Sequence, residues 1–591
     1  MKILDFFLGN IRTFYGYIGT KFFWLIGAII AGGLFESIGI GAFLPILKVG
    51  QPAEDKITRA FRESLAYVDI EPVLPNLLLL LVFIFLAKGV ATLLQEIIML
   101  KVHTGLTYGL RMMLIEKFGA MTFSYYSDMT TGYLNNIVTV EIERMIAAIM
   151  RFVRMLVNIL YVMIYIMISV AVDLKMTIFM CGLGLALIFV VRPLVRLSRR
   201  YSIGISEANA SLQHSLIEYI QNFVYIKATH TFPRFLRHLE ENVANLRNMN
   251  FRVRIVGGVM AASLEPISII LVVGLLYYQV EIQGKAIAEF LVLALFFYRT
   301  FGKLLELQVL WQKFNENLGG VTTIEQARKM LDDHREHVGE TPLELSRLDI
   351  ELDGVSFAYK DQPVLMDLSI RIPTNKTIAI VGESGAGKTT VFGMLTGMLT
   401  PNAGRVLIGD IDFGDLDKFE LRRHFGYVTQ EPVIFLASIA ENISMWASEN
   451  GDEATMAQVR RAAELAHCTE FIDRMPDGFN TIVGERGIRL SGGQRQRIAI
   501  ARELYKEPRI MIFDEATSSL DTDSERLIQA SINDMKGEKT LIIIAHRLST
   551  IRNADFIYVL SKGRLVEEGT FEDLRSIDDG TFQRIYASQQ L

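Results

Sequence analysis

The segment Gly382-Glu383-Ser384-Gly385-Ala386-Gly387-Lys388-Thr389 decides the fold of the C-terminal part of the chain. It fits the pattern GxxxxGK[ST], follows the apolar run 377–381 and precedes the helical run 390–395, which begins with Thr390. Glycines in such a loop let backbone N–H groups converge on phosphate oxygens, and the N-terminus of the next helix adds positive partial charge. We therefore expect Lys388 to contact the β- and γ-phosphates of a nucleotide, and Thr389 to ligate Mg²⁺. A glycine-rich turn without a ligand is the alternative.

A second motif is an apolar strand that ends in two carboxylates, Ile510-Met511-Ile512-Phe513-Asp514-Glu515. An acid at the C-terminal end of a parallel strand lies at the crevice where such sheets bind ligands. Asp514 is expected to hold Mg²⁺ through water, and Glu515 to polarise the attacking water, because phosphoryl transfer depends mainly on positioning and charge stabilisation. The alternative is that the two acids only cap the following helix.

A third motif, Leu490-Ser491-Gly492-Gly493-Gln494, precedes the helical run 498–504. Serine and glycine at a helix N-terminus form a second phosphate-binding cap. Together the three motifs resemble the nucleotide-binding domain of the ABC transporter family, in which this pentapeptide is the signature sequence. The resemblance implies an α/β P-loop domain that binds ATP with Mg²⁺.

The resemblance also assigns roles to residues outside the three motifs. Tyr359 matches the aromatic residue that stacks on adenine. Gln430 matches the glutamine that senses Mg²⁺ and faces the membrane domain, and His546 matches the switch histidine at the γ-phosphate. Asp521 belongs to a segment that resembles the D-loop, although Ser519 stands where alanine is common.

The family resemblance further implies a head-to-tail pair of nucleotide domains. Each ATP then lies between one subunit's phosphate loop and residues 491–494 of the other. One nucleotide domain per chain is typical of a half-transporter, so the expected partner is a second copy of the chain or a related half-transporter. The catalytic positions are all intact, which favours a homodimer.

The first half of the chain has the composition of a membrane domain. Of 591 residues, 51% are hydrophobic and only 21% are charged, which excludes a disordered chain. The formal net charge of −5 does not suggest nucleic-acid binding. A membrane-spanning helix needs about 20 mostly apolar residues. The predicted spans are 22–47, 73–100, 152–172, 176–191, 256–280 and 286–310, the fourth being short enough to extend through Pro193.

These spans define the expected organisation of the chain. Six spans place both ends of the membrane domain on one side, and the arginine-rich segment after span four places that side in the cytoplasm. We expect a multi-pass protein of the inner (plasma) membrane, with the nucleotide domain and both termini cytoplasmic. The expected parts are an interfacial amphipathic helix at 1–20, a six-helix α-helical membrane domain with long intracellular extensions at 21–331, a linker at 332–346 and the nucleotide-binding domain at 347–591.

Ionisable residues inside the spans are costly and deserve a functional hypothesis. Arg299 lies roughly 13 residues into span six, near the midplane at ~1.5 Å per residue, and Lys303 is one turn further on. One interpretation is a basic cavity for an anionic headgroup; the other is internal ion pairing and snorkelling. The further basic candidates are Lys88, Arg151 and Arg154, and the acidic counterparts are Glu36, Glu96, Glu265 and Glu306.

The architecture is similar to that of bacterial ABC exporters of the lipid A flippase type over nearly the whole chain. Residues 35–38 and 44–46 also resemble the opening helix of lipid-linked oligosaccharide flippases. The resemblances imply an ATP-driven exporter or flippase for an amphiphilic, anionic substrate, such as a lipid or lipid-linked glycan, moved outward among membrane lipids. A multidrug or peptide exporter is the alternative, and an ATP-gated channel or regulator is the alternative from another class.

Overall fold

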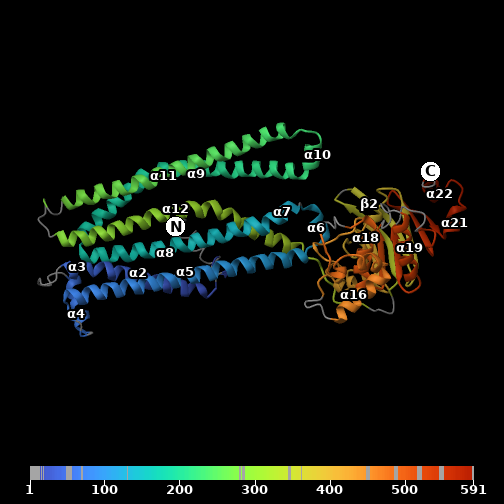
Figure 1. The fold of residues 1–591 in the computed structure, drawn as a ribbon, viewed down its shortest axis with the longest axis horizontal. Helices are drawn as coiled ribbons and strands as arrows, with labels where there is room; N and C mark the ends of the chain where they lie inside the picture. Colours follow the sequence, from blue (N-terminus) through green and yellow to red (C-terminus); the bar gives the residue numbers. More distant parts are fainter. Residues whose placement is uncertain are drawn as a thin grey trace. The chain divides into compact units, whose positions relative to one another are not determined.

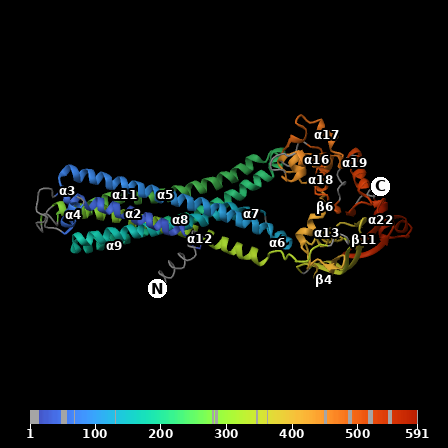
Figure 2. The ribbon, with the colours of Figure 1, turned by 90° about the horizontal axis from the view of Figure 1, so that it is seen from below.

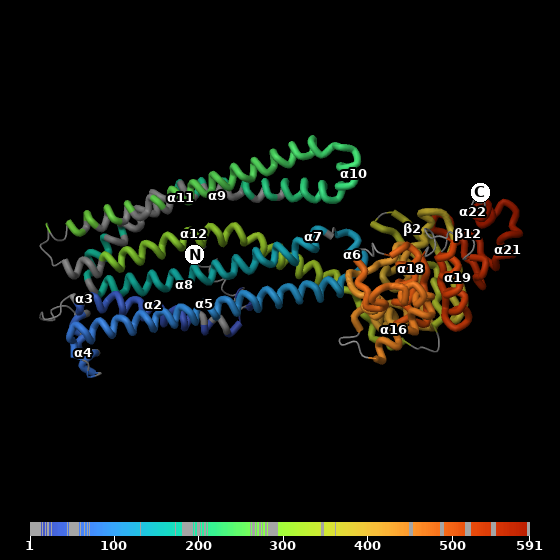
Figure 3. The backbone as a smooth tube through the Cα atoms, viewed as in Figure 1, coloured from blue at the N-terminus to red at the C-terminus, as the bar shows by residue number. Residues whose placement is uncertain are grey.

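The computed structural model describes residues 14, 16–17, 19–47, 56–67, 69, 71–129, 131–277, 281, 287–343, 348–360, 362–447, 453–484, 490–514, 522–544 and 551–588, coloured in Figure 3. The chain divides into two compact units. The first comprises residues 1–119 and 130–333, and the second comprises residues 120–129 and 334–591. The short segment Ala120–Met129 thus packs with the C-terminal unit, although it interrupts the N-terminal one in the sequence.

The first unit is built from helices, as the apolar runs predict. Its elements are α2 (Lys21–Gly41), α3 (Phe43–Leu47), α4 (Lys56–Tyr67), α5 (Leu74–Gly119), α7 (Thr131–Asn136), the π-helical turn η1 (Ile137–Glu141), α8 (Ile142–Val172), α9 (Leu174–Gln221), α10 (Phe223–Ala228), α11 (Phe232–Tyr277) and α12 (Ile287–Asp333). Each predicted span falls largely within α2 to α3, α5, α8, α9, α11 or α12. Among the described residues, Leu74–Gly119 and Gly132–Ala171 are long and apolar enough to cross a membrane, and Ile26–Gly41 is a shorter apolar helix.

Most of these helices extend well beyond the predicted spans. Helix α9 continues through Pro193, and α12 continues through Asp333, so the first two residues of the expected linker are helical. The corner between spans three and four is sharp because Asp173 ends α8 and caps α9, its carboxylate accepting a hydrogen bond from the amide of Met176 at 3.1 Å. Caps of this kind satisfy donors that the first helical turn leaves free.

Packing within the first unit is extensive between α8 and α12, between α2 and α5, and between α9 and α11. Figures 1 and 2 show α9 and α11 running side by side and joined at one end by α10. The expected interfacial helix at 1–20 lies largely outside the described residues. Of its described part, Phe14 is buried and its ring lies 5.2 Å from that of Phe152 on α8, so this residue packs against the bundle.

The second unit contains a six-stranded sheet in the order β12-β11-β3-β10-β9-β6. Strands β3 (Thr377–Gly382), β6 (Phe425–Val428), β9 (Ile510–Asp514), β10 (Thr540–Ile544) and β11 (Phe556–Ser561) are parallel, and β12 (Arg564–Gly569) is an antiparallel edge. A second, antiparallel sheet has the order β2-β1-β4-β5, formed by β1 (Ile350–Tyr359), β2 (Gln362–Ile372), β4 (Ala403–Ile408) and β5 (Ile411–Asp412). The alternation of strands and helices that the sequence predicts is therefore present.

Helices complete this unit. They are α6 (Phe123–Asp128), α13 (Lys388–Leu395), α14 (Lys418–Arg423), α15 (Ile439–Ser444), α16 (Glu453–Leu465), α17 (Thr469–Asp473), α18 (Gly492–Tyr505), α19 (Thr522–Met535), α21 (Phe571–Arg575) and α22 (Thr581–Ser588), with the short pair β7 (Ala437–Ser438) and β8 (Ile482–Val483).

Two hydrophobic cores lie on opposite faces of the parallel sheet. Along β3, Ala379 and Val381 belong to one core, and Ile378 and Ile380 belong to the other. Successive side chains of a strand point to opposite faces, so a strand buried on both faces reads as a continuous apolar run. This explains why the runs 378–381 and 510–513 are apolar throughout.

Candidate functional site

The loop after β3 has the conformation that a phosphate cradle requires. Gly385 and Gly387 have φ angles of +81° and +101°, in the left-handed region where glycine is favoured. A Cβ atom at Gly387 would lie 2.8 Å from a methyl carbon of Leu365, so a side chain there has no space. The loop leads directly into α13, with Gly387 as the N-cap, so the positive partial charge of this helix N-terminus adjoins the loop.

Lys388 lies inside this loop. Its ammonium donates hydrogen bonds to the backbone carbonyls of Gly382 at 2.7 Å and Glu383 at 3.2 Å, and its side chain is buried. A buried ammonium surrounded by backbone groups provides a fixed positive charge for phosphate oxygens. Glu383, Ser384 and Thr389 are exposed at the rim, whereas Ala386 and Thr390 are buried below it.

Further candidates follow the C-terminal ends of neighbouring strands. Asp514 is the last residue of β9, and Gln430 follows β6, which pairs with β9. The hydroxyl of Tyr427 on β6 donates a hydrogen bond to Asp514 at 3.3 Å, and the Tyr427 ring stacks on Phe392 of α13 at 4.0 Å. Burial and the Asp514 carboxylate raise the pKa of Tyr427, so the phenol stays protonated and remains a donor. Tyr427 thus ties the helix of the phosphate loop to the predicted metal ligand.

The donor set fits a hard cation. Thr389 offers a hydroxyl, Asp514 a carboxylate and Gln430 an amide oxygen, and oxygen ligands of this kind suit Mg²⁺, which also keeps several waters and phosphate ligands. Among the residues that the structure describes, no group of three or more His, Cys, Asp and Glu side chains could hold a metal by itself. Glu515, His546 and Asp521, expected beside these ligands, lie outside the described residues.

The predicted adenine-stacking residue ends the first strand of the antiparallel sheet. Tyr359 is 40% exposed, and its ring packs against that of Phe357 in a T-shaped arrangement, with centroids 4.9 Å apart. This contact holds the ring in place while 40% of the residue stays exposed. An exposed aromatic ring held in this way is suited to stacking on a base.

Residues 491–494 form a capping box at the start of α18. The hydroxyl of Ser491 accepts a hydrogen bond from the amide of Gln494 at 3.2 Å, and the side-chain oxygen of Gln494 accepts one from the amide of Ser491 at 2.9 Å. Ser491 is exposed, and Gly493 is buried where a side chain would collide with Ser524 of α19. The box thus presents a helix N-terminus at the surface.

The phosphate loop and the signature segment are flanked by residues that belong to different hydrophobic cores of the same unit. Ala386 and Val391, in and after the phosphate loop, belong to the core that includes Ile380, whereas Leu490 and Ile498 belong to the core that includes Val381. The parallel sheet therefore separates the loop from the signature segment of the same chain.

Two residues of α18 that anchor the backbone beside and after Gln430 have no distinguishing signal in the sequence. Gln496 on α18 is buried, and its amide donates to the carbonyl of Thr429 at 3.2 Å, next to Gln430. The guanidinium of Arg502, also on α18, donates to the carbonyls of Val433 and Asn442, each at 2.7 Å. A lone Gln or Arg on a helix is ordinarily a surface residue, so only the tertiary structure identifies these anchors.

The charged candidates of the membrane region are almost all in ion pairs. Lys88 and Arg299 share the buried carboxylate of Glu36, at 3.0 and 3.6 Å. Lys303 pairs with Glu306 at 3.0 Å, and its ammonium lies 5.4 Å from the centre of the Tyr161 ring. The remaining pair among these candidates is Arg154 with Glu96, at 3.8 Å.

Two candidates differ from that pattern. Nη1 of Arg151 is buried without a hydrogen-bond partner among the described residues. The side chain of Glu265 lies outside the described residues. Four of the basic candidates are therefore in ion pairs, as one of the two interpretations expects. That any of them contacts substrate stays a prediction.

Comparison with known proteins covers nearly the whole chain. Residues 22–297 match the family described as ABC transporter transmembrane region, and residues 365–518 match the family described as ABC transporter. The heterocyst differentiation ATP-binding protein HepA of Nostoc sp. is 32% identical over 469 residues, which cover 78% of this chain and 76% of that protein.

Two further similarities concern an exporter and a flippase. The ATP-dependent lipid A-core flippase of Coxiella burnetii is 43% identical over 273 residues, which cover 46% of this chain and 46% of that protein. A solved structure of a bacterial Atm1-family ABC exporter with ATP bound has a TM-score of 0.76 at 24% identity and covers 97% of this chain and 98% of that chain. At this identity, the similarity to the solved structure concerns the fold alone.

Proposed function

The chain belongs to the ABC transporter family as an exporter-type half-transporter with a membrane domain and an ATP-hydrolysing domain, and we propose that it flips an anionic amphiphile across the inner membrane. The proposed substrate is a lipid or a lipid-linked glycan with a phosphate-containing headgroup. It moves from the cytoplasmic side outward, and Mg²⁺ assists the hydrolysis of ATP.

The pairing of two cations with one carboxylate carries the proposal for the substrate. Helix α5 provides Lys88, α12 provides Arg299 and α2 provides Glu36, so the group has a net charge of +1 inside the membrane region. Arg299 is the more weakly held cation, because its side chain is 48% exposed and its contact with Glu36 is longer. A positive charge in a span is costly unless compensated, and an anionic headgroup would compensate it.

A second copy of the chain is the proposed partner. The sheet separates the phosphate loop from the signature segment of the same chain, and both expose helix N-termini suited to phosphate. ATP bound by the loop of one copy would meet Ser491 of the other, while Glu515 would polarise water at the γ-phosphate. Closure of this interface between the two copies would stabilise the transition state by placing two sets of backbone amides around the phosphates.

The exposed tip of the α9 to α11 hairpin also supports a partner. Ile220, Val224 and Tyr225 are between 67% and 79% exposed in the single chain. Apolar residues that gather at the end of a long helical hairpin mark an interaction surface. We propose that the second copy covers it, with the nucleotide-binding units and the termini of both copies in the cytoplasm.

Reconstitution into liposomes tests the proposal directly. Full-length protein is incorporated into vesicles that contain a fluorescent polyprenyl-pyrophosphate lipid, and dithionite quenching measures how much of the lipid changes leaflet when Mg-ATP is added. The expected result is ATP-dependent flipping of this lipid and little flipping of a matched phosphatidylcholine probe. Flipping of neither lipid, or equal flipping without ATP, would contradict the proposal.

Variants of the basic residues test the assigned site. Arg299→Ala is expected to reduce flipping and lipid-stimulated ATPase activity roughly tenfold while basal ATPase activity changes little, because a substrate contact lowers transport without altering the nucleotide site. Lys313→Ala, which removes an exposed charge from the same helix, is the matched control. ATP-dependent ion current without lipid movement would favour a channel, and preference for a cationic drug or a peptide would favour the other exporter class.

A further inference from the structure

Arg422, at the end of α14, makes an unusual set of contacts behind the phosphate loop. Its guanidinium donates to the backbone carbonyls of Thr396 at 3.4 Å and Gly397 at 3.2 Å, directly after α13. These carbonyls lie at the C-terminus of the helix whose N-terminus forms the phosphate cradle. A cation at a helix C-terminus binds the free carbonyls and complements the helix dipole.

The same guanidinium forms a two-point ion pair with the chain that leaves α12. Nη1 and Nη2 of Arg422 donate to the two carboxylate oxygens of Glu336 at 2.9 and 2.6 Å. Glu336 has only 13% of its side chain exposed, and Arg422 has 27%. Bidentate arginine–carboxylate pairs of this kind fix both distance and orientation, and burial reduces their screening by water.

Glu336 in turn belongs to a short backbone pairing with the segment that contains α6. Its amide donates to the carbonyl of Ala120 at 2.8 Å, and the amide of Thr122 donates to the carbonyl of His334 at 3.0 Å. The ring of His334 stacks on Tyr125 of α6, with centroids 4.1 Å apart and planes 10° from parallel. The start of the linker and α6 therefore form one packed piece.

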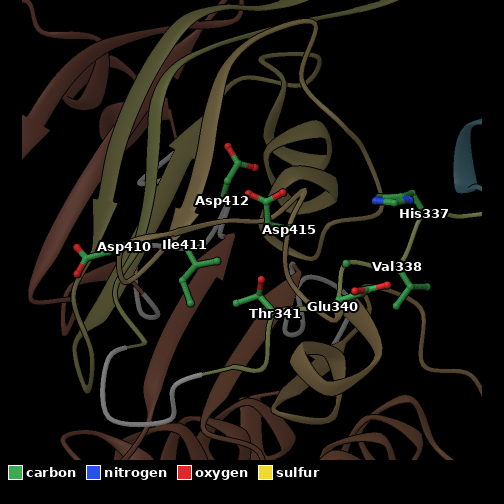
Figure 4. A pocket seen from close by; sticks show the side chains of 9 residues that line it. His337, Val338, Glu340, Thr341, Asp410, Ile411, Asp412 and Asp415 are labelled. Atoms are coloured by element: carbon green, nitrogen blue, oxygen red, sulfur yellow. The ribbon is translucent and has the colours of Figure 1, made fainter.

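The next described part of the linker is held through its backbone. Beyond Glu336, its backbone pairs with the loop after β5 through the amides of Gly339 and Thr341, each 3.0 Å from its acceptor. Between these two stretches lies a cavity of about 450 Å³, whose lining residues are shown in Figure 4. His337, Glu340 and Asp415 are among them. Behind the phosphate loop, Glu336 is the linker residue whose side chain pairs with Arg422.

We propose that Arg422 is a positioning residue that connects the phosphate loop to α6 and to the end of α12. The contacts run without a gap from α13 through Arg422 and Glu336 to the paired backbone at Ala120 and on to α6, all within one compact unit. A shift of α13 on closure around ATP moves Glu336, and with it the start of the linker and the segment Ala120–Met129, both of which continue into helices of the membrane domain. The inference rests on the proposed function, because it concerns how ATP binding drives the membrane domain.

Lys418 is the other cation that faces Glu336. It is buried on α14, and its carbon chain packs near Gly397. Its burial lowers the pKa of its ammonium, and the nearby carboxylates of Glu336 and Asp412 oppose this effect. Lys418 has no hydrogen bond to Glu336 among the contacts of the described residues, so Arg422 alone makes the two-point attachment there.

The test separates nucleotide binding from transmission. Full-length protein in lipid nanodiscs carries spin labels at Gly132→Cys on α7, which is exposed and has open space for a side chain, in a background without the two native cysteines. The distance between labels in the two copies is measured without nucleotide and after trapping with Mg-ATP and vanadate. Affinity for a fluorescent ATP analogue is measured on the same samples.

The expected result is a selective loss of coupling. In Arg422→Ala, ATP affinity stays within about twofold, while the nucleotide-driven change in label-distance populations falls by about threefold to thirtyfold, the range for residues that couple sites. Arg422→Lys keeps the charge but not the two-point geometry, so its distance change is expected to lie between those of the wild type and Arg422→Ala. Arg422→Glu combined with Glu336→Arg does not restore the change, because a carboxylate at position 422 cannot donate to the carbonyls of Thr396 and Gly397. Arg423→Ala, which removes the adjacent surface charge paired with Glu420, behaves as wild type.

The opposite results would overturn the proposal. A full distance change in Arg422→Ala, or full restoration of the change in the swapped pair, shows that the guanidinium contacts of Arg422 do not transmit closure. Equal loss of ATP affinity and distance change assigns Arg422 to stability of the nucleotide unit alone. A wild-type protein without any nucleotide-driven change contradicts the proposed function itself, which distinguishes that failure from failure of this inference.

Discussion

The ammonium of Lys88 lies 3.0 Å from the carboxylate of Glu36, and this pair joins α5 to α2 inside the membrane region. Glu36 has only 7% of its side chain exposed and also lies 3.6 Å from Arg299 of α12. One carboxylate thus holds basic residues from two other helices. Its removal should change both the stability of the bundle and the strength with which the cations attract an anion.

Glu36→Gln is predicted to increase affinity for an anionic lipid. Without the carboxylate, Lys88 and Arg299 lose their shared counter-charge, and the lipid concentration that half-stimulates ATPase activity is expected to fall roughly threefold to tenfold, equivalent to about 1 kcal/mol. The same change should lower the melting temperature, because it leaves two partly buried cations unpaired. The exposed pair of Lys303 and Glu306 provides the control, because Glu306→Gln should have a smaller effect on both lipid stimulation and melting temperature. Weaker stimulation by the lipid in Glu36→Gln would argue against a substrate role for these cations.

Gly387→Ala is predicted to impair ATP binding. The residue has a φ of +101°, and the new methyl group would lie 2.8 Å from Leu365 and 3.2 Å from the carbonyl of Val364. Strain of about 1–3 kcal/mol would distort the cradle and weaken binding of a fluorescent ATP analogue by about tenfold or more. Gly478→Ala shares the left-handed conformation, with φ at +50°, but meets no neighbouring atom, so it should leave ATP affinity unchanged. Equal affinities in both variants would show that the loop conformation is not required.

Glu515→Gln is predicted to abolish hydrolysis while ATP binding survives. The amide cannot accept a proton from water, and loss of a general base costs about 10²- to 10⁴-fold in rate. Phosphate release is the measurement of turnover, and equilibrium binding of the ATP analogue is measured in parallel. Normal turnover in the purified variant would remove Glu515 from the mechanism.

Much of the nucleotide-binding unit follows from the sequence, because local rules and the global fold agree there. The predicted strand 510–514 is β9, and the predicted phosphate loop lies between a buried strand and a helix. Glycines at positive φ, apolar runs buried on both faces and a capping box at Ser491 are each short-range signals. They require no knowledge of distant residues.

The remaining features depend on contacts between distant parts of the chain. The sequence gives no reason to group Ala120–Met129 with the second unit or to pair Glu336 with Arg422, which is 86 positions away. In the membrane region, the sequence leaves open whether Arg299 pairs or binds substrate, and the structure places it beside Glu36. The end of α12 at Asp333 also lies beyond the point where the polar composition predicts the linker to begin.

Mixed dimers test the central claim, which is that ATP is hydrolysed at an interface between two copies of the chain. Each copy carries a different tag so that only dimers with one of each are purified. In one preparation, Lys388→Ala is on one copy and Ser491→Arg on the other; in the second, both changes are on the same copy beside a wild-type partner. If each site combines one copy's loop with the other's signature segment, the first preparation keeps one intact site and the second keeps none. The account predicts that ATPase activity survives in the first and is lost in the second, whereas activity retained only in the second would contradict it.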